Sequence, residues 1–161
     1  MKLCIARLAV SVSLIFVATV ASADGWIVKV PLTSYHWGDI GGYDFNENNL
    51  GFGVGRTREL DRDWSTTLSL AVFPDSYGCL ATNVQLRGAK EVFSGVHLGA
   101  SLNVAFNKCI EPDSDPRTIF APTGSVMFDV TNELSLVFDF APAIADINRV
   151  GFVGFSAEWK F

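Results

Sequence analysis

The chain ends, over residues 151–161, in the stretch Gly-Phe-Val-Gly-Phe-Ser-Ala-Glu-Trp-Lys-Phe. Two faces alternate along it. Val153, Phe155, Ala157, Trp159 and Phe161 form one, and Phe152, Gly154, Ser156, Glu158 and Lys160 form the other. A period of two residues is typical of a β-strand with different surroundings on its two sides. A final strand with an aromatic pair and a terminal Phe is the usual ending of an outer-membrane barrel. This ending therefore favours a membrane β-barrel.

The same alternation recurs along the rest of the chain. Eight segments show it: 26–37, 49–58, 64–73, 79–88, 92–105, 118–130, 133–141 and 151–161. Most are close to the ~9–11 residues that a tilted strand needs to cross a bilayer. An even number of strands can close without a free edge, and closure is needed because unpaired backbone groups in hydrocarbon are costly. We predict an all-β domain, residues 24–161, that forms an eight-stranded antiparallel transmembrane barrel in the outer membrane of a Gram-negative cell. A soluble lipocalin-like barrel, with the same faces buried inward, is the alternative.

The connections between the predicted strands alternate in length. Turns at 59–63, 88–91 and 131–132 are short and polar, whereas loops at 38–48, 106–117 and 142–150 are long. The loop at 74–78 is the one exception, since it belongs with the long loops by its place in the order but is short. In membrane barrels the short turns are periplasmic and the long loops external. Both ends of the barrel domain are therefore expected on the periplasmic side.

Residues 1–23 have the pattern of a cleaved signal peptide. Lys2 and Arg7 give a basic start, an apolar run follows from Leu8 to Val20, and Ala21-Ser22-Ala23 offers small residues for cleavage. Cleavage after Ala23 would leave 138 of the 161 residues and, by removing two basic residues, would take the net charge from −5 to −7. An acidic chain with scattered Lys and Arg does not bind nucleic acid.

Three polar residues are predicted to meet at the external rim. His36 closes the first strand, and Asp75 and Ser76 open the loop after the third. A histidine, a carboxylate and a hydroxyl are the groups needed for acyl transfer, because the imidazole can take the hydroxyl proton while the carboxylate orients it. External rims also collect such residues without any catalytic role. Adjacent strand residues face opposite ways, so Asp75 and Ser76 can converge only if the chain leaves strand geometry near Pro74.

Three glycines, Gly51, Gly53 and Gly55, share one face of the second predicted strand. If that face looks inward, the missing side chains would leave a slot for an acyl chain, since small barrels are normally filled by side chains. The other interpretation is that the glycines relieve crowding in a tightly curled sheet.

Short motifs, in order along most of the chain, resemble the PagP family of lipid A palmitoyltransferases. They are Val30-Pro31 with Tyr35-His36-Trp37, Phe45-Asn46-Glu47 with the glycine run, Phe73-Pro74-Asp75-Ser76-Tyr77, and Ala141-Pro142 with Asn148, Gly151 and the final strand. The family's amphipathic helix before the first strand has no counterpart here, the first loop is shorter, and segment 79–90 does not align with the residue that selects acyl length.

The resemblance implies transfer of a palmitoyl-type acyl chain from a phospholipid donor to lipid A. His36, Asp75 and Ser76 would be the catalytic residues, with His36 as base and Asp75 orienting its ring. Pro31 and Pro142 would mark gaps for lateral lipid entry, because proline has no N–H for the strand ladder. The alternative function is a non-catalytic barrel with a structural or binding role.

Few other residues are candidates for a structural or functional role. Cys79 and Cys109 fall at external strand ends and could form a disulfide in an oxidising compartment. His97 falls on a polar face and is predicted to lie in a lumen hydrogen-bond network. No cofactor motif occurs and the two histidines lack ligand spacing, so neither a cofactor nor a metal is expected, and we expect a monomer.

Overall fold

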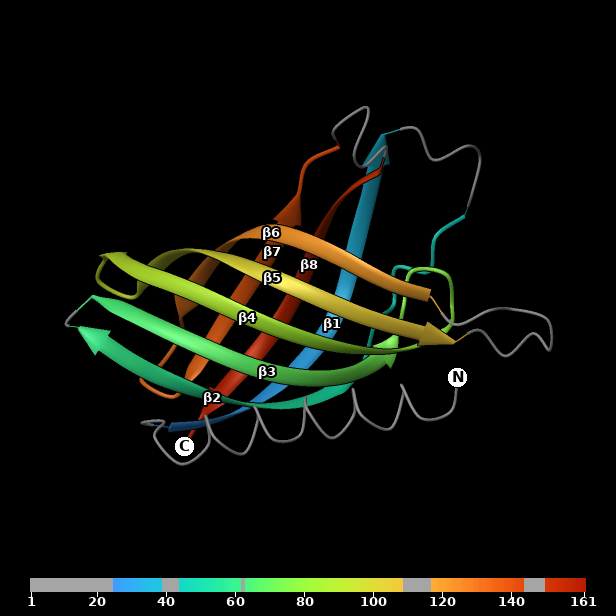
Figure 1. Ribbon diagram of the computed structural model, residues 1–161. Coiled ribbons are helices and arrows are strands. Elements are labelled where there is room, and N and C mark those ends of the chain that lie inside the picture. The colour runs from blue at the N-terminus through green and yellow to red at the C-terminus, as the bar shows by residue number, and fades with distance from the viewer. Residues whose placement is uncertain (1–24, 39–43, 62, 109–116, 144–149) are drawn as a thin grey trace.

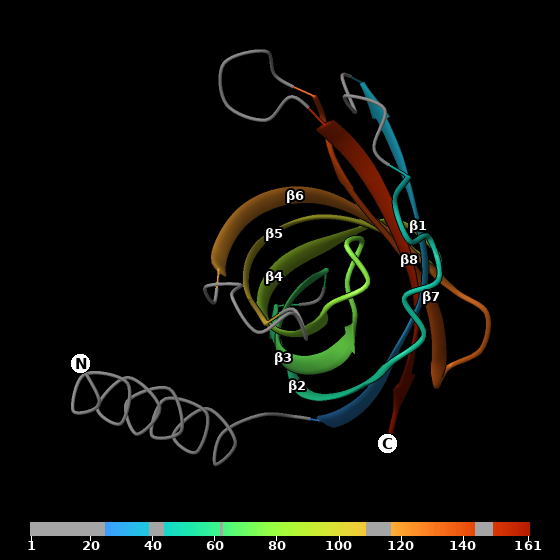
Figure 2. The ribbon, with the colours of Figure 1, turned by 90° about the vertical axis from the view of Figure 1, so that its right-hand side faces the viewer.

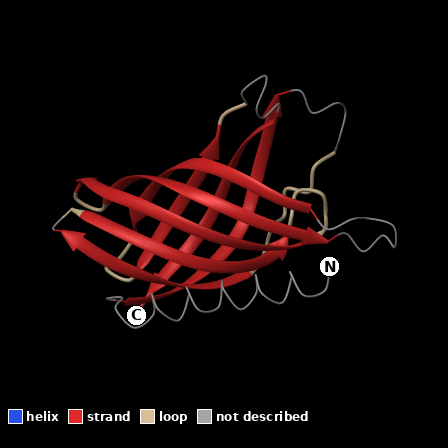
Figure 3. Ribbon diagram, in the orientation of Figure 1, coloured by secondary structure: helices blue, strands red, loops and turns tan. Residues whose placement is uncertain are grey.

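The structure is a computed structural model that describes residues 25–38, 44–61, 63–108, 117–143 and 150–161. The predicted signal peptide and Cys109 lie outside these residues. Every regular element within them is a strand (Figures 1 and 3). No helix in the described part of the chain is long and apolar enough to cross a membrane.

Eight antiparallel strands close into a barrel in which each pairs with its neighbours in sequence and the first pairs with the last. They are β1 (Gly25–Gly38), β2 (Phe52–Asp61), β3 (Trp64–Pro74), β4 (Leu80–Phe93), β5 (Val96–Lys108), β6 (Arg117–Asp129), β7 (Leu134–Ala141) and β8 (Val150–Lys160). The predicted fold is confirmed. One turn was misplaced: segment 88–91 belongs to β4, which continues to Phe93 and turns at 94–95.

Apolar side chains point outward from this barrel and polar side chains point inward. Along β5, Leu98 and Leu102 are each 50% exposed, whereas Ser101 between them is buried. Aromatic residues on the outer surface include Phe120 and Trp159. A soluble barrel would bury its apolar face, so this inverted pattern rules out the lipocalin-like alternative and is what a lipid-facing barrel requires.

A network of charged and polar side chains, here called the lumen network, crosses the middle of the barrel. It consists of Lys29, Gln85, Arg87, Asp139 and Glu158, which come from four different strands. The Lys29 ammonium donates to Gln85 Oε1 at 2.6 Å and lies 3.4 Å from Glu158, and Arg87 binds Glu158 through both terminal nitrogens. Gln85 in turn donates to Asp139 at 3.1 Å. The network separates an external cavity, lined in part by Lys29, Gln85 and Asp139, from a periplasmic one, lined in part by Arg87 and Glu158.

A bulge in β1 sets which residues face the lumen near the external end. Pro31 pairs with Ser156 of β8, but Thr33 pairs with Phe155, so Leu32 is an extra residue in β1. Below the bulge Lys29 and Pro31 line the external cavity, and above it Thr33 and the even-numbered Ser34 and His36 do. An extra residue shifts the alternation by one, and here it turns His36 inward.

The barrel wall is incomplete between β6 and β7 on the external side. Their ladder runs from Asp129↔Ser135 to Gly124↔Phe140, and among the described residues Arg117–Thr123 has no partner on β7. Figures 1 and 2 show the external ends of β6 and β7 pointing apart. Ile119, Ala121 and Thr123 from this unpaired part of β6 line the external cavity. The cavity therefore borders a side of the barrel that no strand ladder closes.

Candidate functional site

The external cavity occupies the lumen between the network and the loops, and its volume is about 230 Å³. Its walls are mainly small or apolar side chains: Pro31, Ala71, Phe73, Ala81, Ala105, Ala121 and Phe152. Lys29, Gln85 and Asp139 form its floor. Drug-sized ligands occupy about 300–1,000 Å³, so this cavity suits one short chain or a small amphipathic molecule.

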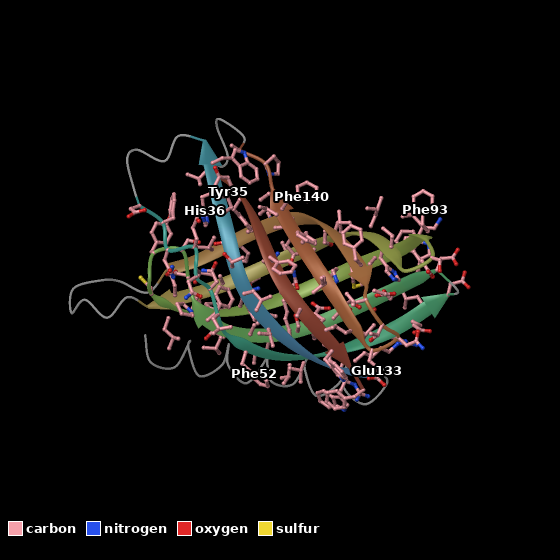
Figure 4. All side chains as sticks on the ribbon, turned by 180° about the vertical axis from the view of Figure 1, so that it is seen from behind. Tyr35, His36, Phe52, Phe93, Glu133 and Phe140 are labelled. Carbon is pink, nitrogen blue, oxygen red and sulfur yellow. The ribbon has the colours of Figure 1, made fainter. Side chains whose placement is uncertain are left out.

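His36 and Ser76 meet at the mouth of the external cavity. His36 Nε2 lies 2.9 Å from Ser76 Oγ, within hydrogen-bonding distance, although the residues are 40 positions apart. The imidazole stacks on Phe45 with ring centroids 4.5 Å apart, and Phe45 contacts Tyr77 edge-on. Figure 4 places His36 at one end of the barrel and Phe93 and Glu133 at the other. The predicted meeting of His36 and Ser76 at one rim is therefore found.

Asp75 does not join this pair. Its Oδ1 accepts from the backbone N–H groups of Tyr77 and Cys79 at 2.9 and 2.8 Å, and its Oδ2 accepts from Asn107 at 2.7 Å. The other ring nitrogen of His36, Nδ1, is buried and has no hydrogen-bond partner among the described residues. The predicted orientation of His36 by Asp75 is therefore wrong. The physical reason is that β3 ends at Pro74, and the Asp75 carboxylate caps the turn that presents Ser76.

Segment 44–50 covers one side of the mouth and is fastened by asparagines. Asn46 Nδ2 donates to the Asp75 carbonyl at 3.0 Å, its backbone N–H donates to the Ser76 carbonyl at 2.8 Å, and Asn49 Nδ2 donates to the Pro74 carbonyl at 2.9 Å. These bonds bring Phe45 onto His36. The Asn-Glu-Asn-Asn run at 46–49 carries the sequence signal for this contact.

Gly51, just before β2, and Gly53 and Gly55 of β2 do not line the external cavity. A Cβ built on Gly53 would lie 2.7 Å from the Ala71 Cβ, and one on Gly55 would lie 2.8 Å from the Ser69 Cβ. On Gly51 it would collide with the Val72 carbonyl and Phe73. The space beside these glycines is thus already filled by β3, which corrects the predicted acyl-chain slot and supports the crowding interpretation.

The two predicted lipid-entry prolines differ. At Pro31 the hydrogen bonds of β1 continue, since Gly51 N–H donates to the Pro31 carbonyl at 3.1 Å and Asn49 N–H donates to the Leu32 carbonyl at 3.2 Å. Pro142 directly follows the end of β7 at Ala141, beside the unpaired part of β6. Only Pro142 therefore lies next to a break in the wall, and lipid passage there stays a prediction.

Cys79 is buried and disulfide-bonded. Its predicted partner, Cys109, lies outside the described residues, so the pairing stays a prediction. We expect denatured, unreduced protein without its signal peptide to react with no thiol reagent, and reduced protein to react at two cysteines per chain. Labelling of both cysteines before reduction would contradict the bridge.

The lumen network is the largest feature that we did not predict as a unit, although its residues carried a signal. Gln85 and Arg87 occupy alternate positions of one strand, and Asp139 and Glu158 lie on the polar faces of two others. His97 was predicted to lie in a lumen hydrogen-bond network, and it lines the periplasmic cavity with its Nε2 2.9 Å from Asp129. Among the described residues no cluster of His, Cys, Asp and Glu could hold a metal ion.

Comparison with known proteins identifies the fold. The chain is similar to the outer-membrane protein Ail of Yersinia pestis in a phospholipid bilayer nanodisc, with 15% identity and a TM-score of 0.51 over 85% of this chain and 99% of Ail. It is also similar to the crystal structure of Ail, the attachment invasion locus protein, with 17% identity and a TM-score of 0.51 over 87% of this chain and 99% of Ail. A de novo designed transmembrane β-barrel gives the same TM-score of 0.51, with 11% identity over 86% of this chain and 97% of the designed chain. No protein-family model and no curated protein matches the chain.

These findings overturn the resemblance to the PagP family and the lipid A acyltransferase function that rested on it. The solved structures named above are Ail and a designed barrel, not palmitoyltransferases, and no family model supports the assignment. The short motifs misled because alternating strands, an aromatic final strand and crowded glycines are shared requirements of small barrels. None of these findings tests whether His36 and Ser76 are catalytic. The chain is a transmembrane β-barrel of the Gram-negative outer membrane.

Proposed function

We propose that this protein is a non-catalytic outer-membrane barrel whose external cavity binds a small amphipathic molecule. The apolar part of the ligand would lie among the alanines of the lumen, and its polar group would lie at the mouth near His36 and Ser76. The observation that carries the proposal is an apolar cavity of about 230 Å³ above a polar floor. Small eight-stranded barrels normally fill this space with side chains, so leaving it open needs a reason.

The small size of the wall residues supports binding. Four alanines, Ala71, Ala81, Ala105 and Ala121, come from four consecutive strands, β3 to β6, and all line the external cavity. Larger residues at these positions would strengthen packing, since buried apolar area contributes about 25 cal/mol per Å². Alanine at all four positions instead leaves room for a chain of methylene groups.

The opening beside β6 supports a ligand from the membrane. Ile119 and Ala121 belong both to the cavity lining and to the part of β6 that has no partner on β7. A molecule dissolved in the outer leaflet could reach the lumen there without crossing the polar rim. The mouth residues His36, Ser76 and Asn49 can accept or donate hydrogen bonds to its polar group.

Replacing Ala105 by phenylalanine is expected to weaken binding, because the new ring would occupy the external cavity. The protein would be placed in phospholipid nanodiscs with 13C-labelled alanine methyl groups and titrated with 1-octanol. We expect saturable shifts of the lumen methyl signals of Ala71, Ala81 and Ala121 in the unmodified protein, and a dissociation constant at least about tenfold higher in Ala105→Phe, equivalent to 1.4 kcal/mol.

Ala100→Phe is the matched control, because Ala100 is on the same strand but exposed on the outer surface. This variant should bind 1-octanol as the unmodified protein does. The outward Ala100 and Ala157 methyl groups report simple partition into the bilayer and should shift without saturating. Lumen signals that also fail to saturate would refute the proposed function.

A further inference from the structure

Charged side chains at the periplasmic end of the barrel are divided between the two sides of its wall. Carboxylates at this end line the periplasmic cavity: Glu59, Asp61, Asp63, Glu91, Asp129 and Glu133. On the outer side, the charged side chains that the structure describes at this end are all basic, and we call Arg56, Arg58 and Lys90 the outer basic cluster. The inside of this end is therefore acidic and the outside basic.

The alternation of the strands fixes the direction of the outer basic cluster. Arg58 follows Thr57 on β2, and Thr57 lines the periplasmic cavity. Lys90 precedes Glu91 on β4, and Glu91 also lines it. Because successive strand residues point to opposite faces, Arg58 and Lys90 point away from the lumen, as does Arg56, two residues before Arg58.

The outer basic cluster lies at the depth of lipid headgroups. Arg58 is three residues from the end of β2, and Lys90 is three residues from Phe93, which Figure 4 places at the end opposite His36. Two tryptophans accompany the cations: the Arg56 guanidinium carbon is 4.4 Å from the centre of the Trp26 ring, and the Lys90 ammonium is 5.8 Å from that of Trp64. Aromatic girdles mark the interfaces of membrane barrels, where headgroups lie.

The wall between Arg58 and Lys90 gives a phosphate group room to approach. Arg58 pairs with Thr66 of β3, and Thr66 pairs with Gly88 of β4, two residues before Lys90. A Cβ built on Gly88 would meet no heavy atom within 4 Å. Arg58 and Lys90 are both exposed, and among the described residues no carboxylate forms an ion pair with either.

The division of charge favours an anionic headgroup over a zwitterionic one. Phosphatidylethanolamine would bring an ammonium group beside the outer basic cluster, while the carboxylates that could pair with it line the cavity on the other side of the wall. Phosphatidylglycerol brings only the negative phosphate. Arginine can bind a phosphate through two parallel N–H donors, and lysine binds it as a point charge.

We propose that the outer face of β2–β4, at the periplasmic end, binds the phosphate of an anionic phospholipid in the inner leaflet of the outer membrane. Arg58 and Lys90 bind the phosphate, and Arg56 adds to the positive charge around it. The glycerol backbone of the lipid lies over Gly88. This site is on the opposite side of the wall from both cavities, so it does not depend on the proposed function.

The test measures which lipids stay on the barrel. Nanodiscs that contain the protein and equal amounts of phosphatidylglycerol and phosphatidylethanolamine with the same acyl chains are opened in a mass spectrometer, and the retained lipids are identified. We expect the unmodified barrel to retain phosphatidylglycerol at least about tenfold more often than phosphatidylethanolamine. Arg58→Gln and Lys90→Gln should each lower this ratio about fivefold, the effect of one basic residue near an anionic surface.

Lys160→Gln is the matched control, because it removes the same charge at the same end of the barrel from a side chain that lines the periplasmic cavity. It should keep the ratio, and so should Arg58→Lys, which keeps the charge. Equal retention of the two lipids by the unmodified barrel would overturn the proposal. An equal loss in Lys160→Gln would also overturn it, because retention would then follow net charge rather than the outer basic cluster.

An added competitor separates a lipid from free phosphate. Excess inorganic phosphate should leave the ratio unchanged, since it has no acyl chains to hold it at the barrel surface. Displacement of phosphatidylglycerol by inorganic phosphate would overturn the assignment of a lipid. If Arg58→Gln does not insert, Lys90→Gln and the ratio in the unmodified barrel decide the outcome.

Discussion

Glu158→Gln is expected to lower the free energy of unfolding by about 3–5 kcal/mol, the usual cost of breaking a buried ion pair by removing one partner. Glu158 is 4% exposed and Arg87 2% exposed, and the two form a bidentate pair with one N···O distance of 3.0 Å. Without the carboxylate, Lys29 and Arg87 would face each other across the lumen with only Asp139 left to balance them. Glutamine has nearly the same size and shape as glutamate, so the loss of unfolding free energy reflects the missing charge rather than a change in volume.

Glu59→Gln is the matched control for this experiment. Glu59 pairs with Lys160 at 2.8 Å, but the two side chains are 63% and 41% exposed. Exposed pairs contribute about 0–1 kcal/mol, so this variant should unfold nearly like the unmodified barrel. Urea unfolding in lipid vesicles measures both. Adding Arg87→Met to Glu158→Gln should recover part of the loss, because it removes the uncompensated cation. Equal costs for the buried and exposed variants would contradict the account of the lumen network.

Leu102→Arg is expected to cost about 2–4 kcal/mol of folding free energy in a bilayer, the range for a basic residue on the lipid face at the midplane. Leu102 lies near the middle of β5, points outward, and pairs with Leu86 and Pro122 on the flanking strands. An arginine at this position would place a charge in hydrocarbon. The same urea unfolding experiment in vesicles measures the effect.

Phe93→Arg is the control for the depth of the substitution. Phe93 is 75% exposed and lies at the end of β4, at the opposite end of the barrel from His36 (Figure 4). Near the interface, arginine on the outer surface costs only about 0–1 kcal/mol. Comparing the losses of folding free energy in Leu102→Arg and Phe93→Arg therefore shows which part of the barrel lies at the centre of the bilayer. If both variants lost the same amount, Leu102 would not lie at the centre of the lipid-facing belt.

The incorrect site predictions share one cause, which is that the directions of side chains at a turn, and the packing of a neighbouring strand, are set by tertiary structure. Asp75 was predicted to orient His36 because the two residue types suit catalysis. Its carboxylate instead accepts hydrogen bonds from the backbone N–H groups of Tyr77 and Cys79 and from the Asn107 side chain. The glycine run was assigned to a slot, yet the neighbouring strand fills the space. Ser76 was placed correctly because β3 ends at Pro74, as the sequence had suggested.

The amino-acid sequence by itself determined the number of strands and their order. These are local properties, since a period of two residues decides which side chains share a face of a strand and turn residues decide where strands end. Tertiary structure alone decided the site. The bulge at Leu32 turned His36 into the lumen, because one extra residue reverses the alternation beyond it. The contact between His36 and Ser76, which are 40 positions apart, likewise depends on the packing of distant strands and loops, which no local pattern in the chain encodes.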